Sequence, residues 1–546
     1  MKRFFGILIL ILFSQRLIAQ VNESRPKLVV GIVVDQMRQE YLSRFSKHFS
    51  EGGFKRFMNE GYSYKNAHYN YVPTQTGPGH ASIYTGTTPR VHGIVSNDWY
   101  NKKTKRSINC VEDEFASHLG GSKKYGNRSP KNLMNTTVTD ELRMFFQERT
   151  RIISISLKDR GAILPGGHNP NGAYWYDDST GEFMTSTYYK KELPGWVEDF
   201  NNRKLPTEYM KKQWDTFFPI ETYVESEKDL RTYENPLLPN GEPIFPYDLK
   251  AISKKVPGGL LLPNTPYGNT ILVELAKEAI ENESLGEDEI TDFLAVSFSS
   301  TDYIGHAYGP YSKEIQDTYV RLDRDLEHLF NELDKRIGKG NWTMFLTADH
   351  AVAAIPHGLI EKKQKGNYWE DEKMAKKIKN DIEGQFKVSG LVEMVNSNQV
   401  YFNRDVLVDQ KLSLNEVKSF TVGYLETIDG ISFAYDVRKI HGYQGDQKDA
   451  KLISNGTYIK RSGDIIYALS SGWLSDGYIM GGTTHGSQYS YDTHVPLIFF
   501  GKDIKKGVSV DNVTITSIAP TISMLLNIGL PDGVTGQPLS EVLITE

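Results

Sequence analysis

The sequence contains a single cysteine, Cys110, among 546 residues. One cysteine excludes an intramolecular disulfide, and it excludes metal sites built from several thiolates, such as zinc fingers and iron–sulfur clusters. Any metal in this chain must therefore be bound by histidine and carboxylate side chains. We expect Cys110 itself to be a small, buried, apolar residue.

Long apolar runs are also missing. The one strongly apolar run, Phe4 to Phe13, has about ten residues, which is too short to span a bilayer. It follows Lys2 and Arg3 and precedes a small-residue cleavage point at Ala19, so residues 1–19 are predicted to be a signal peptide. The product is expected to be periplasmic or secreted, with no stable membrane insertion.

An excess of basic charge is the third feature that the sequence lacks. The formal net charge is −5, so no overall positive field would attract nucleic acid, and a general DNA or RNA binder is not expected. Hydrophobic residues make up 39% and charged residues 24%, which is typical of a soluble globular protein. We expect a monomer that acts on small molecules.

Apolar runs rich in β-branched residues alternate with helical patterns along the chain. The predicted strands cover 27–34, 151–157, 292–299, 342–347 and 494–500. Helical spacing occurs over 40–61, 270–281 and 312–336. Strands alternating with helices predict an α/β fold in which a mostly parallel central sheet lies between layers of helices.

Two segments interrupt this alternation within one large catalytic domain, residues 20–546. Residues 192–263 are rich in Pro, Tyr and Asn and have little periodicity. Residues 388–478 contain short alternating runs. Both are interpreted as insertions, and the second as a small cap of strands and helices.

Polar residues that can bind metal follow the ends of the predicted strands. Asp35 ends the first strand, Asp302 and His306 follow a later one, and Asp349 and His350 follow another. His485 lies in a Gly-rich loop. In open α/β sheets, ligands bind beyond the carboxyl ends of the strands, so these residues are expected to meet at one edge. Asp302 and His306 are four apart and would share one side of a helix.

Thr76 lies in the run Thr-Gly-Pro-Gly-His, just before a predicted helix over 79–85. A hydroxyl at a helix N-terminus lies near free N–H groups and the positive end of the helix dipole, which together favour a phosphate group. Alone, such a threonine would more often be a simple helix cap. The surrounding metal-ligand types favour the phosphate interpretation.

Taken together, these residues resemble the alkaline phosphatase superfamily in order and approximate spacing. The motifs that carry the resemblance are Asp35, Thr76-Gly-Pro-Gly-His80, Asp302-x-x-x-His306, Asp349-His350 and His485-Gly486. Pro73-Thr-x-Thr76 and Thr85-Gly86…His92-Gly93 are similar to its phosphodiesterase/nucleotide pyrophosphatase branch. The run Ser156-Leu-Lys-Asp-Arg-Gly-Ala162 resembles the PafA-type, phosphate-irrepressible bacterial alkaline phosphatases.

The resemblance implies an exported phosphomonoesterase with two zinc ions. Asp302, His306 and His485 would hold one ion, and Asp35, Asp349 and His350 the other, next to Thr76. Zinc accepts such nitrogen and oxygen ligands in sites that keep an open position. Thr76 would be the nucleophile, through a covalent phosphothreonine intermediate, and inorganic phosphate would be released.

The same resemblance implies that Lys158, Arg160 and Asn97 contact the phosphoryl oxygens. Without it, Lys158 and Arg160 would be a solvated basic pair, on one side of an extended segment, and Asn97 an ordinary turn residue. The other histidines near motifs are expected to have structural roles. They are His80, His92, His168, His357 and His494.

Three other functions compete with this interpretation. A phosphodiesterase or nucleotide pyrophosphatase on the same scaffold is the main alternative, and Lys158 and Arg160 argue against it because a diester lacks one charged oxygen. A sulfatase would need a modified Cys or Ser nucleophile, and Cys110 lies in no such motif. A non-catalytic binding protein is disfavoured because every expected ligand and the nucleophile are present.

Overall fold

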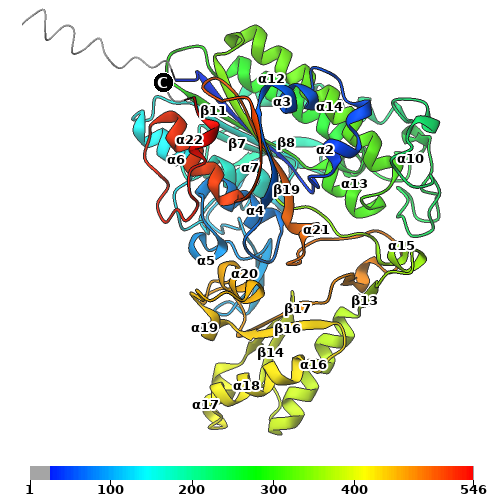
Figure 1. Ribbon diagram of the computed structural model, residues 1–546, viewed down its shortest axis with the longest axis vertical. Helices are drawn as coiled ribbons and strands as arrows, with labels where there is room; N and C mark the ends of the chain where they lie inside the picture. Colours follow the sequence, from blue (N-terminus) through cyan, green and yellow to red (C-terminus); the bar gives the residue numbers. More distant parts are fainter. Residues whose placement is uncertain (1–24, 545–546) are drawn as a thin grey trace, which may run out of the picture.

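A computed structural model describes residues 25–544. The predicted signal peptide lies outside the described residues. Among residues 25–544, no helix is long and apolar enough to cross a membrane. Two bodies are visible, a large one built on a twisted sheet and a narrower lobe below it (Figure 1).

The large body contains a ten-stranded sheet in the order β20-β2-β19-β12-β1-β11-β6-β7-β8-β5. In chain order, the strands are β1 (Leu28–Val34), β2 (Tyr62–His68), β5 (His118–Leu119), β6 (Ile152–Ser156), β7 (Gly172–Asp177), β8 (Glu182–Ser186), β11 (Asp292–Phe298), β12 (Trp342–Thr347), β19 (His494–Gly501) and β20 (Gly507–Thr514). All the strands predicted from the sequence belong to this sheet.

The central strands are buried on both faces, as their apolar runs require. Every residue of β1, β11 and β12 is buried. β1 pairs in parallel with β11 on one side and with β12 on the other, so the three strands end at the same edge. β6 and β7 continue this parallel set.

Helices cover both faces of the sheet (Figure 1). One layer contains α12 (Tyr267–Asn282), α13 (Ser300–Tyr308) and α14 (Lys313–Leu333). The other contains α4 (Thr76–Thr85), α6 (Val138–Phe145), α7 (Asp159–Gly166) and α22 (Ile518–Leu526). The predicted α/β fold, a central sheet between helices, is confirmed.

The sheet is mixed beyond its parallel centre. β19 runs antiparallel to both β12 and β2. The start of β19 therefore lies at the edge where β12 and β2 end. A loop before β19 and a loop after β2 thus reach the same edge as the loops that follow the parallel strands.

The helix expected over residues 40–61 is divided into three short pieces: α2 (Tyr41–Arg44), a 3₁₀ turn (Ser46–His48) and α3 (Phe54–Glu60). The break is held by Asp323, whose carboxylate accepts hydrogen bonds from the backbone N–H of Ser50 and of Phe54. A Cβ at Gly53 would lie 2.2 Å from Asp323 Oδ1, so only glycine fits there. The expectation of one helix was wrong, because a distant side chain replaces the helical hydrogen bonds.

Residues 192–263 pack on the main core rather than forming a core of their own. They contain α8 (Gly195–Asn202), α9 (Leu205–Tyr209), α10 (Leu249–Ile252) and α11 (Gly258–Leu261), with a two-stranded sheet of β9 (Gln213–Trp214) and β10 (Tyr247–Asp248). Trp214 and Tyr247 belong to the same apolar cluster as the central strands.

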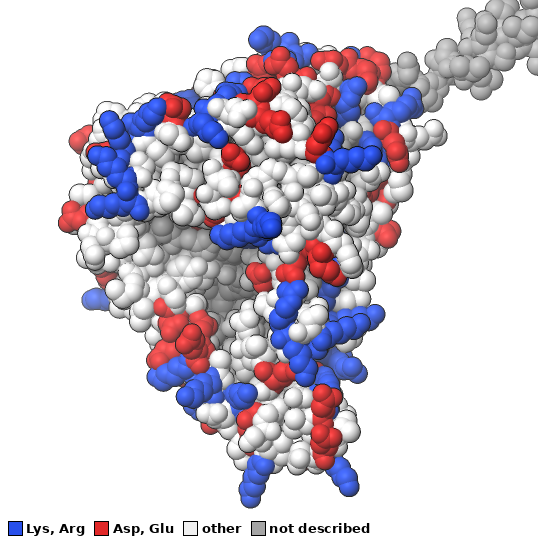
Figure 2. Space-filling model, turned by 180° about the vertical axis from the view of Figure 1, so that it is seen from behind, with Lys and Arg blue, Asp and Glu red and all other residues white. Residues whose placement is uncertain are grey.

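The narrower lobe has a separate core around a four-stranded sheet in the order β14-β15-β17-β16. These strands are β14 (Val392–Asn396), β15 (Gln399–Phe402), β16 (Ile431–Asp436) and β17 (Ile465–Leu469). The helices α16 (Asp371–Phe386) and α18 (Leu414–Leu425) contribute to this core. From behind, the molecule is hollowed where this lobe meets the large body (Figure 2).

Candidate active site

One edge of the sheet brings together residues from distant parts of the chain. Asp35 directly follows β1, and Asp302 lies in the first turn of α13, after β11. Asp349 and His350 follow β12. The loop before β19 supplies His485, and the segment after β2 supplies Thr76. All of them are buried or nearly so, as expected for residues that follow buried strands.

Thr76 is the first residue of α4, and Gln75 precedes it in an extended conformation at the N-cap position. No side chain caps this helix. The Thr76 Oγ1 atom lies 3.5 Å from His350 Nε2 and is directed into the site. The interpretation of Thr76 as a simple helix cap therefore fails.

The glycine three residues after Thr76 lets α4 approach the metal-ligand loop. A Cβ on Gly79 would lie 2.4 Å from the backbone oxygen of Asp349. Real atoms do not come so close, so a larger residue would push the helix and Thr76 away from Asp349. The second glycine of Thr-Gly-Pro-Gly thus allows Thr76, the candidate nucleophile, to lie close to the loop after β12.

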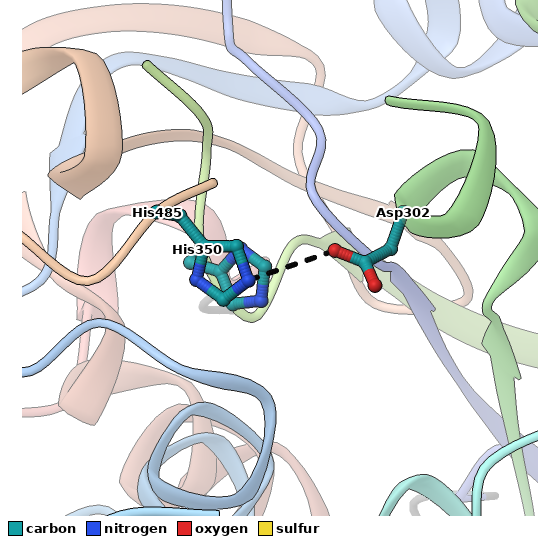
Figure 3. A group of neighbouring side chains, drawn as sticks. All are labelled: Asp302, His350 and His485. Carbon is teal, nitrogen blue, oxygen red and sulfur yellow. Dashed lines mark ion pairs between the residues drawn. The ribbon is translucent and has the colours of Figure 1, made fainter. Parts of the chain in front are cut away.

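The first predicted ligand group meets at the carboxylate of Asp302. The Nε2 atom of His306 lies 3.1 Å from Asp302 Oδ1, and the Nε2 atom of His485 lies 3.7 Å from the same oxygen. Figure 3 shows Asp302 facing His485, whose ring is stacked on that of His350, with ring centres 3.4 Å apart. Ligand atoms of Asp302, His350 and His485 lie within 4.8 Å of one another.

The second predicted group consists of Asp35, Asp349 and His350, whose ligand atoms also lie within 4.8 Å of one another. His350 Nε2 is 3.4 Å from Asp35 Oδ1 and 3.6 Å from Asp349 Oδ2. Both of these buried oxygens lack a hydrogen-bond partner among the described residues. A buried carboxylate oxygen without a partner is costly, so both oxygens fit a site for a cation.

The three histidines are held in the tautomer that a metal requires. The Nδ1 atom of His306 donates to the Thr483 carbonyl at 2.7 Å, that of His350 to the Ala351 carbonyl at 3.0 Å, and that of His485 to the Thr74 carbonyl at 2.8 Å. A carbonyl can only accept, so each Nδ1 carries the proton. In the neutral ring, the Nε2 lone pair is then left for the site.

The charges in the site are only partly compensated by the chain itself. Burial, followed by repulsion from Asp302 and Asp349, raises the pKa of Asp35 well above its usual value. Burial raises the pKa of Asp349 to about 6. Burial also lowers the pKa of His350 to about 3, so this ring is neutral. Three carboxyl groups and neutral imidazoles in a buried space suit divalent cations.

Lys158 lies between the two ligand groups. Its Nζ atom donates to Asp35 Oδ2 at 2.7 Å and to Asp302 Oδ2 at 2.5 Å, and only 5% of its side chain is exposed. Burial acts to lower the pKa of Lys158, but the carboxylates of Asp302 and Asp35 outweigh it and raise the pKa. A solvated basic surface residue is therefore excluded for Lys158.

Lys158 and Arg160 line one cavity together with Tyr303, although the segment is not extended as expected. Lys158 is the extended N-cap residue of α7, and Arg160 lies in its first turn. The helix begins there because Asp159 can occupy its positive end. The Arg160 Nε atom is buried and has no hydrogen-bond partner among the described residues.

Asn97 contacts the helix that carries Thr76. Its Oδ1 atom accepts a hydrogen bond from the backbone N–H of Gly77 at 2.7 Å. The Gln75 side chain accepts from the backbone N–H of Asn97 at 3.0 Å, which fixes its loop. With Oδ1 engaged, the amide NH₂ of Asn97 remains available as a donor. An ordinary turn asparagine would bond within its own turn instead.

Gln36 is a site residue that sequence reasoning missed. Its Nε2 atom donates to Asp302 Oδ1 at 2.6 Å, and its backbone N–H donates to Asp349 Oδ1 at 3.2 Å. It has a positive φ of 64°. The only signal in the sequence was its position, directly after Asp35 at the end of a strand.

The remaining histidines have structural partners. His80 Nδ1 donates to the Thr76 carbonyl at 2.9 Å, and its Nε2 atom lies 2.8 Å from Ser297 Oγ. His92 lies 2.9 Å from Ser82 Oγ, and His168 lies 2.9 Å from Asp140 Oδ2. His357 contacts the Tyr368 hydroxyl, and His494 contacts the Lys65 carbonyl. Cys110 is buried and free, as expected.

The sequence matches the family described as "Type I phosphodiesterase / nucleotide pyrophosphatase" over residues 29–492. It is 44% identical over 521 residues to the alkaline phosphatase PafA of Elizabethkingia meningoseptica, covering 95% of each chain. It is also 44% identical over 524 residues to the alkaline phosphatase PhoV of Synechococcus elongatus, covering 95% of this chain and 93% of the relative.

The fold also matches solved structures. The crystal structure of wild-type PafA superposes with a TM-score of 0.91 at 44% identity, covering 95% of this chain and 99% of that one. A second crystal structure, of a PafA variant with one threonine, one asparagine, one lysine and one arginine replaced, gives the same TM-score at 43% identity, with the same coverage.

Proposed function

We propose that this chain transfers the phosphoryl group of its substrate to Thr76, beside two zinc ions. The chain belongs to the type I phosphodiesterase / nucleotide pyrophosphatase family. It is an alkaline phosphatase that hydrolyses phosphate monoesters. The observation that supports this most directly is the position of Thr76, whose Oγ1 atom lies 3.5 Å from His350 Nε2. His350 takes part in both groups of potential metal ligands.

Two zinc ions fit the residues that are present. Asp302, His306 and His485 would hold one, and Asp35, Asp349 and His350 the other, with Thr76 beside it. The donor set is nitrogen and oxygen, each Nδ1 is bonded to a backbone carbonyl so that Nε2 is the ligand atom of the neutral ring, and Asp35 Oδ1 and Asp349 Oδ2 have no hydrogen-bond partner among the described residues. Bound zinc would supply Lewis-acid stabilisation of the attacking and leaving oxygens.

Thr76 carries the covalent step. The Thr76 hydroxyl gives its proton to water, and its Oγ1 forms a bond to phosphorus while the bond from phosphorus to the ester oxygen breaks. The departing alkoxide takes up a proton from water, so that one proton passes in net from Thr76 to the alcohol. A water molecule then attacks phosphorus, so that inorganic phosphate leaves and the Thr76 hydroxyl is restored. Hydrolysis of a monoester can require acceleration of about 10²¹, or about 28 kcal/mol, which no single side chain can supply.

Asn97, Lys158 and Arg160 are proposed to bind the non-bridging phosphoryl oxygens. The Asn97 side chain is bonded through Oδ1 to the backbone N–H of Gly77, the residue after Thr76, and both cations line one cavity. Arginine offers a planar pair of donors and lysine a point charge. The PafA variant supports this choice. Its replaced threonine and asparagine are as far apart in sequence as Thr76 and Asn97, and its replaced lysine and arginine are as far apart as Lys158 and Arg160.

The main alternative is a preference for phosphodiesters, which the family description also includes. The buried Lys158 favours monoesters, since a monoester dianion carries one more charged oxygen than a diester. A desolvated ammonium and guanidinium would bind that extra oxygen strongly, whereas an esterified oxygen cannot use the same charges.

The proposal also covers the location of the enzyme and the role of the narrower lobe. Residues 1–19 would direct the chain to the periplasm or the medium, and the enzyme would act there as a monomer. Residues 388–478 would form a cap beside the active site. The cavity between the lobe and the large body supports this, because it is lined by Gln75 and His485 on one side and by Gln399 and Tyr467 on the other.

One comparison tests the proposed function. The kcat/KM of an aryl phosphate monoester and of its methyl diester are measured on protein whose zinc content is determined in the same sample. We expect about two zinc ions per chain and a higher kcat/KM for the monoester. A higher kcat/KM for the diester would instead favour a phosphodiesterase, and hydrolysis by metal-free protein would contradict the zinc proposal.

A further inference from the structure

One arginine of the narrower lobe contacts the segment that carries Asn97. Arg461 is partly buried and lies shortly before β17. Its guanidinium donates to the carbonyl of Gly93 and, at 2.7 Å, to that of Asn132. Its Cζ atom lies 5.0 Å from the centre of the Trp99 ring. Arg461 therefore contacts the chain on both sides of Asn97, four residues before it and two residues after it.

This guanidinium has no carboxylate partner. Burial lowers the pKa of Arg461, and no acidic side chain among the described residues forms an ion pair with it. A cation that is taken out of water without an anion costs stability, and two carbonyls and an aromatic face compensate only part of that cost. The cost has a reason if Arg461 serves to hold the segment that it contacts.

Asn97 stands at the base of a hairpin. The strands β3 (Asp98–Asn101) and β4 (Arg106–Asn109) follow it directly and pair antiparallel. Just after β4, the backbone N–H of Cys110 donates to the Asn97 carbonyl at 2.8 Å. The hairpin thus closes at Asn97 itself, and a shift of the hairpin would also shift the Asn97 side chain.

The lobe also contacts this hairpin beyond its base. The buried rings of Tyr100 and Tyr401 pack edge to face, with their centres 5.2 Å apart. Lys105 Nζ lies 3.4 Å from Glu393 Oε1, and Lys102 Nζ lies 5.6 Å from the centre of the Tyr401 ring. Tyr401 belongs to β15 and Glu393 to β14, both strands of the lobe sheet. The lobe therefore contacts both the segment before Asn97 and the hairpin after it.

We propose that Arg461 is a positioning residue, through which the narrower lobe holds Asn97 where its amide can reach a phosphoryl oxygen. This inference rests on the proposed contact between Asn97 and the substrate. A misplacement of about 1 Å can cost about a hundred-fold in rate, so the support of such a donor matters. None of the contacts of Arg461 described above is with Thr76 or with a proposed zinc ligand, so its effect on catalysis would pass through Asn97.

A double-mutant cycle on the zinc-loaded full chain tests the proposal. Arg461→Gln should lower the kcat/KM of a phosphate monoester about ten-fold in the wild-type background, but less than about two-fold in Asn97→Ala, where the group that it positions is gone. Arg461→Lys keeps the charge but loses the planar pair of donors, so its loss should lie between those of wild type and Arg461→Gln. Arg438→Gln, at an exposed position of the same lobe, is the matched control and should keep the wild-type kcat/KM.

A second readout does not depend on turnover. The dissociation constant of inorganic phosphate, measured by calorimetry on the same proteins, should rise in Arg461→Gln and should not rise further when Arg461→Gln is added to Asn97→Ala. If Arg461→Gln does not fold, Arg461→Lys takes its place in both measurements, with a smaller loss that should again disappear in Asn97→Ala.

Three results would overturn the proposal, and they can be told apart. If the Arg461 variants lose the same factor in both backgrounds, Arg461 only supports the fold. If they lose nothing in the wild-type background, the hydrogen bonds of Asn97 within the large body hold it without help from the lobe. If Asn97→Ala alone leaves monoester kcat/KM unchanged, the proposed role of Asn97 fails first, and this inference fails with it.

Discussion

The Nζ atom of Lys158 lies 2.5 Å from Oδ2 of Asp302. Because it also donates to Asp35, at 2.7 Å, this ammonium bridges the two groups of proposed zinc ligands. In the proposed mechanism, this charge would face the negative oxygens of a phosphoryl group held beside Thr76. This position connects the proposed metal ligands, the proposed nucleophile and the expected preference for monoesters.

Replacing Lys158 and Arg160 together by alanine should reduce monoester hydrolysis far more than diester hydrolysis. Charge-assisted contacts contribute about 1.5–3 kcal/mol each, so the loss in monoester kcat/KM should be about two to four decades. The measurement is the ratio of the two kcat/KM values in wild type and double variant. Equal losses on both substrates would mean that these residues only position the site.

Asn97 can be tested by two variants that should lose activity to different extents. Asn97→Asp keeps the oxygen that accepts from the Gly77 N–H but replaces the amide donor by a negative charge. We expect monoester kcat/KM to fall by about one to two decades or more in Asn97→Asp, and less in Asn97→Ala, because a carboxylate would repel the phosphoryl oxygens. If Asn97→Asp retained more activity than Asn97→Ala, Asn97 would serve only to anchor the helix.

His92 gives a prediction on pH and stability. Burial lowers the pKa of His92 to about 3, against 6.5 for the exposed side chain. Between these two values the unfolded chain binds the proton and the folded chain does not, so stability is lost as the pH falls below 6.5. This group should therefore cost about 1.4 kcal/mol per pH unit between pH 6 and pH 4.

The check compares urea unfolding of wild type and His92→Gln at pH 7 and pH 5. His92→Gln should be less stable at pH 7, because the contact with Ser82 Oγ at 2.9 Å is changed. The difference between the two proteins should then shrink at pH 5, since the variant has no proton to gain at this position. A difference that stays constant would mean that His92 is already protonated or exposed in the folded protein.

The central part of the fold could be predicted from the sequence, because the central buried strands are near-continuous apolar runs, although the buried strand β7, with the sequence GAYWYD, was not predicted. β1 and β12 illustrate this, and Asp35 and Asp349 were placed correctly at their ends. β2 was missed: its sequence, YSYKNAH, is too polar to indicate a strand, and it pairs with β19 and β20 through backbone hydrogen bonds. No pattern in the sequence indicated that β19 runs antiparallel to its neighbours.

Tertiary contacts explain the other differences. The expected helix over residues 40–61 is interrupted because the Asp323 side chain, from α14, takes over two backbone N–H groups. Gln36 was not recognised because its contacts with Asp302 and Asp349 depend on a positive φ that no sequence pattern indicates. The resemblance to a family supplied the grouping of the metal ligands, which spacing alone left open.

Removal of metal should abolish activity and loosen the site. A chelator should leave protein that does not hydrolyse monoesters, and added zinc should restore hydrolysis at about two ions per chain. Without metal, the one ammonium among the described residues that contacts the ligand carboxyl groups is Lys158, which donates to Asp35 and Asp302 but not to Asp349, so the melting temperature should also fall. Full activity in protein shown to be metal-free would refute the assignment of these ligands.

The most direct test of the account is the turnover of Thr76→Ala in protein with a normal zinc content. Thr76→Ser keeps the hydroxyl and serves as the control, and it should retain much of the wild-type activity. If Thr76 is the nucleophile, the kcat/KM of Thr76→Ala for a phosphate monoester should fall by about three decades or more while about two zinc ions remain bound. A Thr76→Ala protein that hydrolysed monoesters within ten-fold of the wild-type rate would contradict the covalent phosphothreonine mechanism.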